Sequence, residues 1–306
     1  MMDASPTDSS NSPSPDRWQI NPKRAVHADR PLCIGILNIT PDSFSDGGEH
    51  DSAESAVDRA RAIVDEGGDG LDIGGESTRP GAERVSAEEQ MVRVVPVIEA
   101  IRRAGIELPI TIDTTRSRVA QAALDAGADA INDVSAGTED DAMLDLAAQR
   151  GCGIILMHRV LAPDQDRYSD QYDDRPEGAP IRQRVVERVV GALRDRRDAA
   201  ITAGVERSCI VLDPGLGFGK DVEQNLELIR GTDQIVELGQ PVLSALSRKS
   251  FVGRVGLGRD SEPSERVSAT IALSVLHMAR GARFFRVHDV AVHRQALDAA
   301  WAMLAD

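Results

Sequence analysis

Residues 34–48 read IGILNITPDSFSDGG, an apolar run that turns abruptly into a polar loop. The run suits a strand that is buried on both faces, because its apolar character is continuous rather than alternating. The loop behind it carries Asn38, Asp42 and Asp46 and closes on a pair of glycines. Parallel α/β folds present functional groups in this way, at the point where a buried strand ends. The same succession recurs along the chain and predicts its fold.

Short apolar runs of this kind occur eight times, each followed by a polar or glycine-rich junction and then by a helical pattern. The runs cover residues 32–38, 69–75, 109–113, 129–133, 153–158, 208–213, 241–247 and 283–288. Apolar residues at helical spacing predict helices over 52–66, 86–104, 116–126, 142–149, 181–203, 222–229, 264–279 and 290–304. Eight strand–helix units in about 275 residues indicate a single (β/α)8 TIM barrel with its active site at the C-terminal ends of the strands. A doubly wound sheet is the alternative.

The composition limits the class of partner and the compartment. A net charge of −15 argues against nucleic acid and against an anionic membrane surface. No apolar stretch approaches the ~18 residues that a membrane span needs. Three isolated cysteines, Cys33, Cys152 and Cys209, without any C-x-x-C spacing favour buried reduced thiols and a cytoplasmic protein.

The first residues of the chain differ from the rest. Residues 1–16 are rich in serine, proline and aspartate and hold too few apolar side chains to offset the entropy of ordering. We therefore expect residues 1–30 to be a disordered or loosely attached N-terminal extension, and residues 31–306 to form one barrel domain.

Polar side chains stand at the predicted carboxyl ends of the strands, where barrel active sites form. A carboxylate matches an amino-plus-ring N–H edge bidentately, so several of these side chains suit a flat heterocycle with alternating donors and acceptors. These are Asp113, Asn132, Asp213 and Lys249. Met157 and Phe218 would supply the apolar walls that such a ring requires.

Other strand ends suit anions and a metal ion. Arg286 and His288 are two residues apart at a strand end, so they share a face, and beside a helix N-terminus they suit phosphate. Asn38 and Asp46 offer hard oxygen ligands, consistent with a partly hydrated Mg²⁺ that bridges to phosphate. Arg79, in a glycine-rich loop, could hold a second anion. The pattern predicts a ring pocket, a diphosphate pocket and a separate carboxylate clamp.

The segment DPGLGFGK (213–220) superficially resembles a phosphate-binding loop but lacks the required spacing. We interpret its glycines as turn formers. Lys220 at its end is as consistent with a solvated side chain as with a ligand.

With these residues assembled, the chain closely resembles the dihydropteroate synthases. The matching segments are LNITPDSFSDGG (37–48), DIGGESTRPGA (72–82), IDT (112–114), INDVSAG (131–137), LMH (156–158), LDPGLGFGK (212–220), SRKSFVG (247–253) and RVHDV (286–290). The resemblance implies a TIM barrel that pairs as a homodimer. It also implies a Mg²⁺-dependent, dissociative condensation of 6-hydroxymethyl-7,8-dihydropterin diphosphate with 4-aminobenzoate, which yields 7,8-dihydropteroate and diphosphate for folate synthesis.

The resemblance assigns roles by motif. The residues implied to hold the pterin are Asp113, Asn132, Met157, Asp213, Phe218 and Lys249. Those implied at the diphosphate are Asn38, Thr78, Arg286, Val287 and His288, with Asn38 and Asp46 at the metal. Those implied at the aminobenzoate are Phe44, Thr78, Arg79, Pro80 and Ser250. The catalytic set is Asp113, Lys249, Arg286, His288 and Asp46, the last on a predicted lid over residues 40–48.

Two alternative functions share parts of this pattern. A non-catalytic pterin-binding paralogue would keep the ring pocket but lose the anion-binding groups, which are present here. A methyltetrahydrofolate:corrinoid methyltransferase could share the ring-binding Asp113 and Asn132, but the STRPG and SRKS segments favour the synthase. The segment that follows His158 keeps little of the family's usual sequence, so the resemblance says little about that loop.

Overall fold

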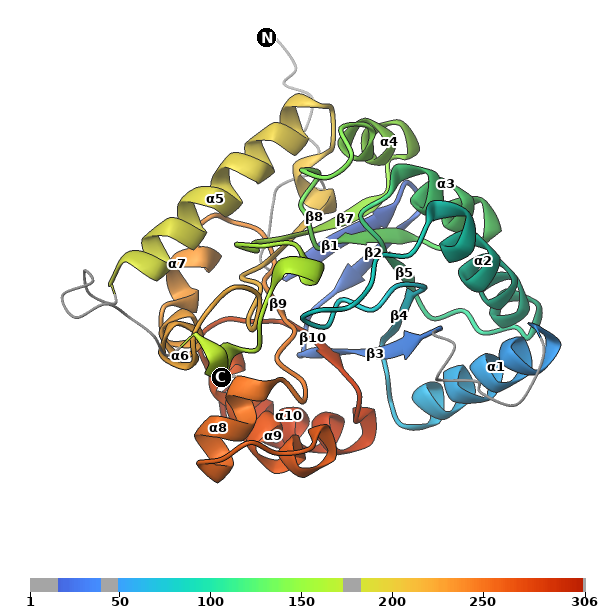
Figure 1. Cartoon of the computed structure of the whole chain (residues 1–306). Coiled ribbons are helices and arrows are strands. Elements are labelled where there is room, and N and C mark those ends of the chain that lie inside the picture. The colour runs from blue at the N-terminus through green and yellow to red at the C-terminus, as the bar shows by residue number, and fades with distance from the viewer. Residues whose placement is uncertain (1–15, 40–48, 173–182, 305–306) are drawn as a thin grey trace, which may run out of the picture.

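The computed structural model of the protein describes residues 16–39, 49–172 and 183–304. Eight parallel strands lie in the order β8-β7-β6-β5-β4-β3-β10-β9, and Figure 1 shows them ringed by helices. The strands are β3 (Leu32–Asn38), β4 (Gly70–Gly74), β5 (Ile110–Asp113), β6 (Ala130–Asp133), β7 (Gly153–Met157), β8 (Ile210–Asp213), β9 (Leu243–Ser244) and β10 (Phe284–Val287).

The two end strands of this order meet and close the sheet. The pairing across this gap is an isolated parallel bridge between Leu212 and Val242, accompanied by a hydrogen bond of 2.9 Å from the Leu212 amide to the Pro241 carbonyl oxygen. Because the sheet returns to itself, the TIM-barrel prediction is confirmed and the doubly wound alternative is wrong. Every predicted strand is present, although β9 covers two residues of its predicted seven.

Helices follow the strands and cover the outside of the barrel (Figure 1). They are α1 (Glu49–Asp65), α2 (Ala87–Arg103), α3 (Ser117–Ala126), α4 (Ala142–Arg150), α5 (Gln183–Thr202), α6 (Val222–Arg230), α7 (Thr232–Val236), α8 (Ser250–Leu257), α9 (Val267–Ala279) and α10 (Val290–Leu304). Ser86 caps α2 by accepting a hydrogen bond from the Glu89 amide, as its position before the apolar pattern suggests. The sequence did not predict α7 and α8.

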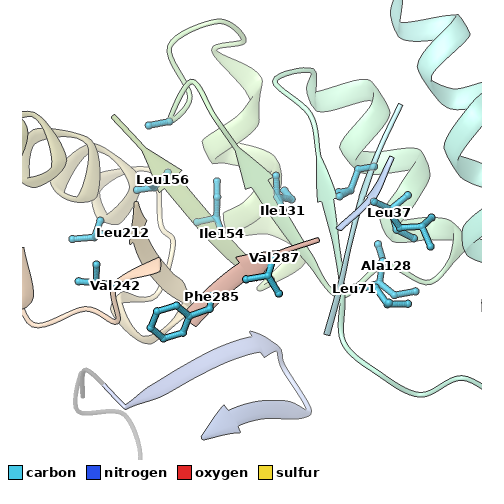
Figure 2. Packing of buried hydrophobic residues seen from close by; sticks show 14 of the residues in the cluster. Leu37, Leu71, Ala128, Ile131, Ile154, Leu156, Leu212, Val242, Phe285 and Val287 are labelled. Atoms are coloured by element: carbon cyan, nitrogen blue, oxygen red, sulfur yellow. The ribbon is translucent and has the colours of Figure 1, made fainter. Parts of the chain in front are cut away.

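Successive strand residues alternate between two apolar layers, because side chains in a strand point to opposite faces. The outer layer packs against the helices, and Figure 2 shows Leu37, Leu71, Ile131, Ile154 and Phe285 within it. The inner layer fills the lower barrel; it contains Leu32, Ile34, Ala130, Ile155, Val211, Leu243 and Phe284. Continuing this alternation along the strands places Asn38, Asp113, Asn132, Asp213 and Arg286 on the inner face.

An antiparallel hairpin of β1 (Arg17–Asn21) and β2 (Arg24–His27) packs on the barrel at the N-terminal end of the strands. Trp18 is 2% exposed and lies edge-on to Phe284, with ring centroids 5.6 Å apart. Its indole N–H donates to the carbonyl oxygen of Cys209 at 2.8 Å, just before β8. The prediction of a disordered or loosely attached extension is therefore wrong for residues 17–27, because Trp18 and Ile20 join the inner core. Residues 1–15 lie outside the described part.

Within residues 16–39, 49–172 and 183–304, no helix is both long enough and apolar enough to span a membrane.

Candidate active site

Polar side chains fill the upper end of the barrel, above the apolar inner layer. The strand register aligns Asn38 with Gly74, Gly74 with Asp113, and Asp113 with Asn132 across four neighbouring strands. On the other side of the barrel, Met157 of β7 pairs with Asp213 of β8. The predicted ring-binding residues of four strands, β5 to β8, therefore converge on one end of the barrel, as their positions in sequence indicated.

Arg286 lies at the centre of this layer and joins two buried carboxylates. Its Nε is 2.5 Å from Oδ2 of Asp72, and its Nη2 is 2.7 Å from Oδ2 of Asp113. Asn132 donates from Nδ2 to both oxygens of Asp72 at 3.3 Å, and the Thr111 hydroxyl donates to Asp72 as well. Burial acts to lower the pKa of Arg286, but Asp72 and Asp113 together raise it. A permanently charged guanidinium thus holds the positions of both carboxylates.

The two predicted ring-binding aspartates are buried among charges. Burial raises the pKa of Asp113 to about 7, with Arg286 opposing the shift and Asp72 adding to it. Burial also raises the pKa of Asp213, and the nearby Lys249 opposes that shift. Asp213 accepts a hydrogen bond of 2.7 Å from the Gly215 amide, which fixes the carboxylate at the start of the loop. Both carboxylates are therefore prepared to pair with a ligand that carries N–H donors.

Lys249 and Phe218 form the opposite wall of the layer. The Lys249 ammonium lies 4.1 Å from the ring centroid of Phe218 and donates to the carbonyl oxygen of Leu216. Gly217, at φ +83°, lets the lysine pass, since a Cβ there would be 2.7 Å from Cδ of Lys249. Burial lowers the pKa of Lys249 to about 8, although Asp213 raises it. Met157 packs in the same small apolar cluster as Phe218, as predicted for the ring walls.

The predicted phosphate-binding residues continue from Arg286 along β10. Nδ1 of His288 lies 3.0 Å from Oγ of Ser247. Burial lowers the pKa of His288 to about 3, and Arg286 and Arg248 lower it further, so the imidazole is neutral. The Val287 side chain packs in the outer apolar layer (Figure 2). Only its backbone can face the site.

Asn38 ends β3 with an exposed side chain. Its Oδ1 lies 3.8 Å from the position that a Cβ on Gly74 would take, and Cβ of Asp113 lies 3.3 Å from the same position. The absence of a side chain at Gly74 therefore leaves the amide oxygen of Asn38 close to Asp113. The other predicted metal ligand, Asp46, and the aminobenzoate residue Phe44 lie outside the described residues. The described ranges hold no group of three or more His, Cys, Asp or Glu suited to a metal.

The remaining predicted aminobenzoate residues lie on loops at the rim. Thr78 and Pro80 are half-buried and Arg79 is exposed in the loop between β4 and α2. Ser250 is the first residue of α8, and its hydroxyl accepts a hydrogen bond of 3.3 Å from the Ser169 amide. These four residues thus lie outside the buried polar layer, and their assignment stays a prediction.

Two buried charges of the site were not assigned from the sequence. Asp72 lies within the apolar run of β4, and its signal in the sequence is that a carboxylate buried in such a run must be paired. Lys220 is fully buried and donates to three carbonyl oxygens, those of Gly215 (2.8 Å), Phe218 (2.9 Å) and His158 (3.2 Å). It is neither solvated nor a free ligand, because it holds the 213–220 loop together.

Comparisons with known proteins agree with this geometry. The sequence profile of the family described as pterin binding enzyme matches residues 34–288. A dihydropteroate synthase from Streptococcus pyogenes serotype M6 is 44% identical over 257 residues, which are 84% of this chain and 90% of that protein. The chain belongs to the dihydropteroate synthase family.

Other members of the dihydropteroate synthase family extend the comparison. The Xanthomonas albilineans enzyme with 4-aminobenzoic acid superposes with a TM-score of 0.82 at 41% identity, covering 95% of this chain and 99% of that one. The same enzyme with 7,8-dihydropteroate gives 0.77 at 39% identity, covering 92% and 97%. A Haloferax volcanii protein, named a probable bifunctional folylpolyglutamate synthase/dihydropteroate synthase, is 45% identical over 88% of this chain, which spans 30% of that protein.

Proposed function

We propose that the protein is a dihydropteroate synthase. It transfers the 7,8-dihydropterin-6-ylmethyl group from 6-hydroxymethyl-7,8-dihydropterin diphosphate to 4-aminobenzoate in folate biosynthesis. The observation that carries this proposal is the buried polar layer in which Arg286 joins Asp72 and Asp113, beside Asp213 and the Lys249–Phe218 wall. This layer offers hydrogen-bond acceptors and donors to the edges of a pterin. It also holds a cation, Arg286, between two of its carboxylates.

The reaction breaks the bond between the methylene carbon and the diphosphate oxygen, and the electron pair leaves with the diphosphate. A new bond then forms between this carbon and the aniline nitrogen, which finally loses a proton to solvent. Asp113 would stabilise the positive charge that develops on the pterin-methyl group, because a fixed carboxylate needs little reorganisation in a buried site. Arg286 and His288 would hold the departing diphosphate. In this scheme the enzyme needs no covalent intermediate.

Mg²⁺ is the proposed cofactor, with Asn38 and Asp46 as its protein ligands. The donor set fits, because Mg²⁺ commonly keeps several waters and takes one or two protein oxygens together with substrate phosphates. The exposed amide oxygen of Asn38 beside Gly74 offers one such ligand. When bound, the ion would neutralise charge on the diphosphate. The role of Asn38 is to hold a hard oxygen at a fixed strand end.

The deciding experiment measures diphosphate release from the pterin diphosphate with 4-aminobenzoate, in the presence and absence of Mg²⁺. We expect release that requires both substrates and falls on removal of the ion. Pterin binding without any release would indicate the non-catalytic paralogue. Preferential binding of a methylated folate would indicate the corrinoid-dependent methyltransferase.

We propose in addition that the protein is a homodimer that pairs through its C-terminal helices. Large apolar side chains are exposed on three neighbouring helices: Val255 and Leu257 on α8, Leu276 on α9 and Val292 on α10. Leu276 is 57% exposed, and contiguous exposed apolar surface commonly marks an interface. Sedimentation equilibrium should give a dimer for the wild type and a monomer for Leu276→Asp.

The cytoplasm is the proposed compartment. All three cysteines are buried and free, which suits a reducing environment. Fractionation of cells that express the protein would test this placement.

A further inference from the structure

The loop that leaves β7 crosses the rim of the barrel. Its described part, residues 159–172, is called the strap below; it contains two short 3-10 turns, η3 (Pro163–Gln165) and η4 (Ser169–Gln171). The carbonyl oxygen of Pro163 accepts from the Gly81 amide at 2.8 Å, which joins the strap to the loop after β4. Ser169 donates from its amide to the Ser250 hydroxyl at 3.3 Å. The strap thus connects the loop after β4 with the start of α8.

Asp166 makes the connection to the loop after β8. Its side chain is buried, and Oδ2 accepts from the Gly219 amide at 2.9 Å. Its other oxygen, Oδ1, accepts from the Arg167 amide at 2.7 Å and from the Tyr172 hydroxyl. All three partners are donors, so the site selects a carboxylate, which has only acceptors.

The strap also packs directly on the backbone of the loop after β8. Gly219 has φ +64°, and a Cβ on it would lie 2.5 Å from Cβ of Val160. Gly219 is adjacent to Phe218, whose ring faces the Lys249 ammonium. Whatever fixes the Gly219 amide therefore fixes the position of the Phe218 ring.

We propose that Asp166 is a positioning residue for the pterin pocket. It anchors Gly219, and the neighbouring backbone then places the Phe218 ring beside the Lys249 ammonium. This inference rests on the proposed function, since the pocket that Asp166 serves is the pterin pocket of that reaction.

Asp166 also adds a negative charge to the group of charges around Lys249. Asp213 from β8, Asp113 from β5 and Asp166 from the strap favour its charged form, and Arg286 from β10 opposes it. Lys220, from the loop after β8, is a second cation in this group, and its own charge also interacts with Asp166. Without the Asp166 charge, two of these carboxylates, Asp213 and Asp113, remain beside Lys249 and the two other cations, Arg286 and Lys220. Lys249 should then lose its proton at a lower pH.

The test is steady-state diphosphate release by the full chain and by Asp166→Asn, with each substrate varied in turn. The variant keeps the shape of the side chain, but its N–H₂ group replaces an oxygen that accepts a hydrogen bond. At least one of the present donors, such as the Gly219 amide, would then face another donor. We expect KM for the pterin diphosphate to rise about tenfold, as for the loss of a hydrogen bond to a charged group, with KM for 4-aminobenzoate changed less than about twofold. The fall of kcat/KM at high pH (the basic limb of the pH profile), which reports the loss of the Lys249 proton, should also move to lower pH.

Two further variants separate charge from packing. Tyr172→Phe removes one hydrogen bond to Asp166 and leaves its charge, so the basic limb should stay where the wild type has it. Asp166→Glu keeps the charge but changes the reach, so the pterin KM should rise without movement of the limb; it also serves if Asp166→Asn does not fold.

Several results would overturn the proposal. The first is an Asp166→Asn variant with the wild-type pterin KM and an unchanged fall of kcat/KM at high pH. The second is a loss of kcat in that variant with both KM values and the fall at high pH unchanged. The third is an Asp166→Glu variant in which the fall at high pH moves as far as in Asp166→Asn. Wild-type protein that releases no diphosphate in the same assay would instead contradict the proposed function, so the two failures are distinguishable.

Discussion

At the scale of single residues, the buried Asp113 and the half-buried Lys249 are ionisable groups on opposite sides of the proposed pterin pocket. Arg286 forms an ion pair with Asp113, and the charge of Asp213 favours the ammonium form of Lys249. Asp113→Asn removes the charge that would face the developing cation, and Lys249→Ala removes a donor and the cation over Phe218. We expect either change to lower kcat/KM for diphosphate release by at least about a hundredfold, the loss typical of a preorganised electrostatic group. Circular dichroism would check that both variants are folded, and turnover near that of the wild type would contradict the assigned roles.

The same two residues predict the pH dependence of the reaction. The carboxylate of Asp113 must be ionised, so activity should rise with pH through its pKa of about 7. The Lys249 ammonium must be charged, so activity should fall as pH rises through its pKa of about 8. A plot of kcat/KM against pH should therefore be bell-shaped with a narrow maximum between these values. A profile that is flat from pH 6 to pH 9 would argue that neither group titrates in the free enzyme.

The polar residues at the strand ends were predictable because each stands at the end of its own apolar run, which is a local feature of the sequence. Asp113, Asn132 and Asp213 each end an apolar run, and the structure places each on the inner face. Asp72 and Lys220 could not be assigned in the same way, because the pairing of each depends on the folded structure. Arg286 lies 214 residues from Asp72, and the burial of Lys220 depends on the fold of its own loop and on His158.

At the scale of elements, Glu139, in the loop between β6 and α4, connects three other rim loops. It accepts from Arg84 of the loop after β4 at 2.9 and 2.7 Å, from the Thr115 hydroxyl at 2.6 Å, and from Arg159 of the strap. Burial acts to raise the pKa of Glu139, but hydrogen bonds from these three residues lower it to about 2. This carboxylate holds the loop that carries the predicted aminobenzoate residues.

Glu139→Gln should loosen that loop, because an amide cannot accept from both arginines in the same way. We expect KM for 4-aminobenzoate to rise about three- to tenfold, with a smaller change in the pterin KM. Since the pKa of Glu139 is lowered in the folded state, its stabilisation is complete above the ordinary pKa of about 4.5 and is lost as pH falls toward about 2. The stability deficit of Glu139→Gln in denaturant titrations should accordingly shrink between pH 6 and pH 3.

Glu99→Gln is the matched control, because it removes an exposed pair with Arg103 on α2. It should leave both KM values unchanged. Equal KM values for aminobenzoate in the Glu139 variant and the wild type would contradict a tethering role.

The elements that the sequence failed to predict are short or packed by distant residues. Helix α8 begins immediately after Lys249 and contains two glycines within eight residues, so its helical pattern is weak. The β1–β2 hairpin has only nine strand residues in total, and its stability comes from the contact of Trp18 with the barrel. Long amphipathic helices such as α2 and α10 were predictable because their own periodicity defines the buried face.

At the scale of the whole molecule, the proposed active site and the hairpin lie at opposite ends of the barrel. Trp18→Ala should destabilise the protein by about 3–5 kcal/mol, the usual cost of truncating a buried aromatic side chain. The kcat of the folded variant should stay that of the wild type, because no site residue contacts the hairpin among those described. Denaturant unfolding and diphosphate release on the same preparation would measure both quantities.

Arg17→Ala provides the comparison on the same strand. Its guanidinium contacts the Gln19 side chain, so a change within about 0.5 kcal/mol is expected for such a partly exposed residue. A loss of kcat in Trp18→Ala at a temperature where it is folded would show that the two ends of the barrel are coupled.

The bridge between Leu212 and Val242 has a consequence for slow motions of the barrel. Neighbouring strand pairs share longer ladders, whereas β8 and β9 meet at this one bridge and at the Pro241 carbonyl. Amide protons at this seam should exchange with deuterium earlier than those of β4 or β5, because the local opening there breaks fewer bonds. Asp213 ends one side of the seam and Lys249 follows the other. A ligand held by both residues would span the seam, so its binding should slow exchange there more than anywhere else in the sheet.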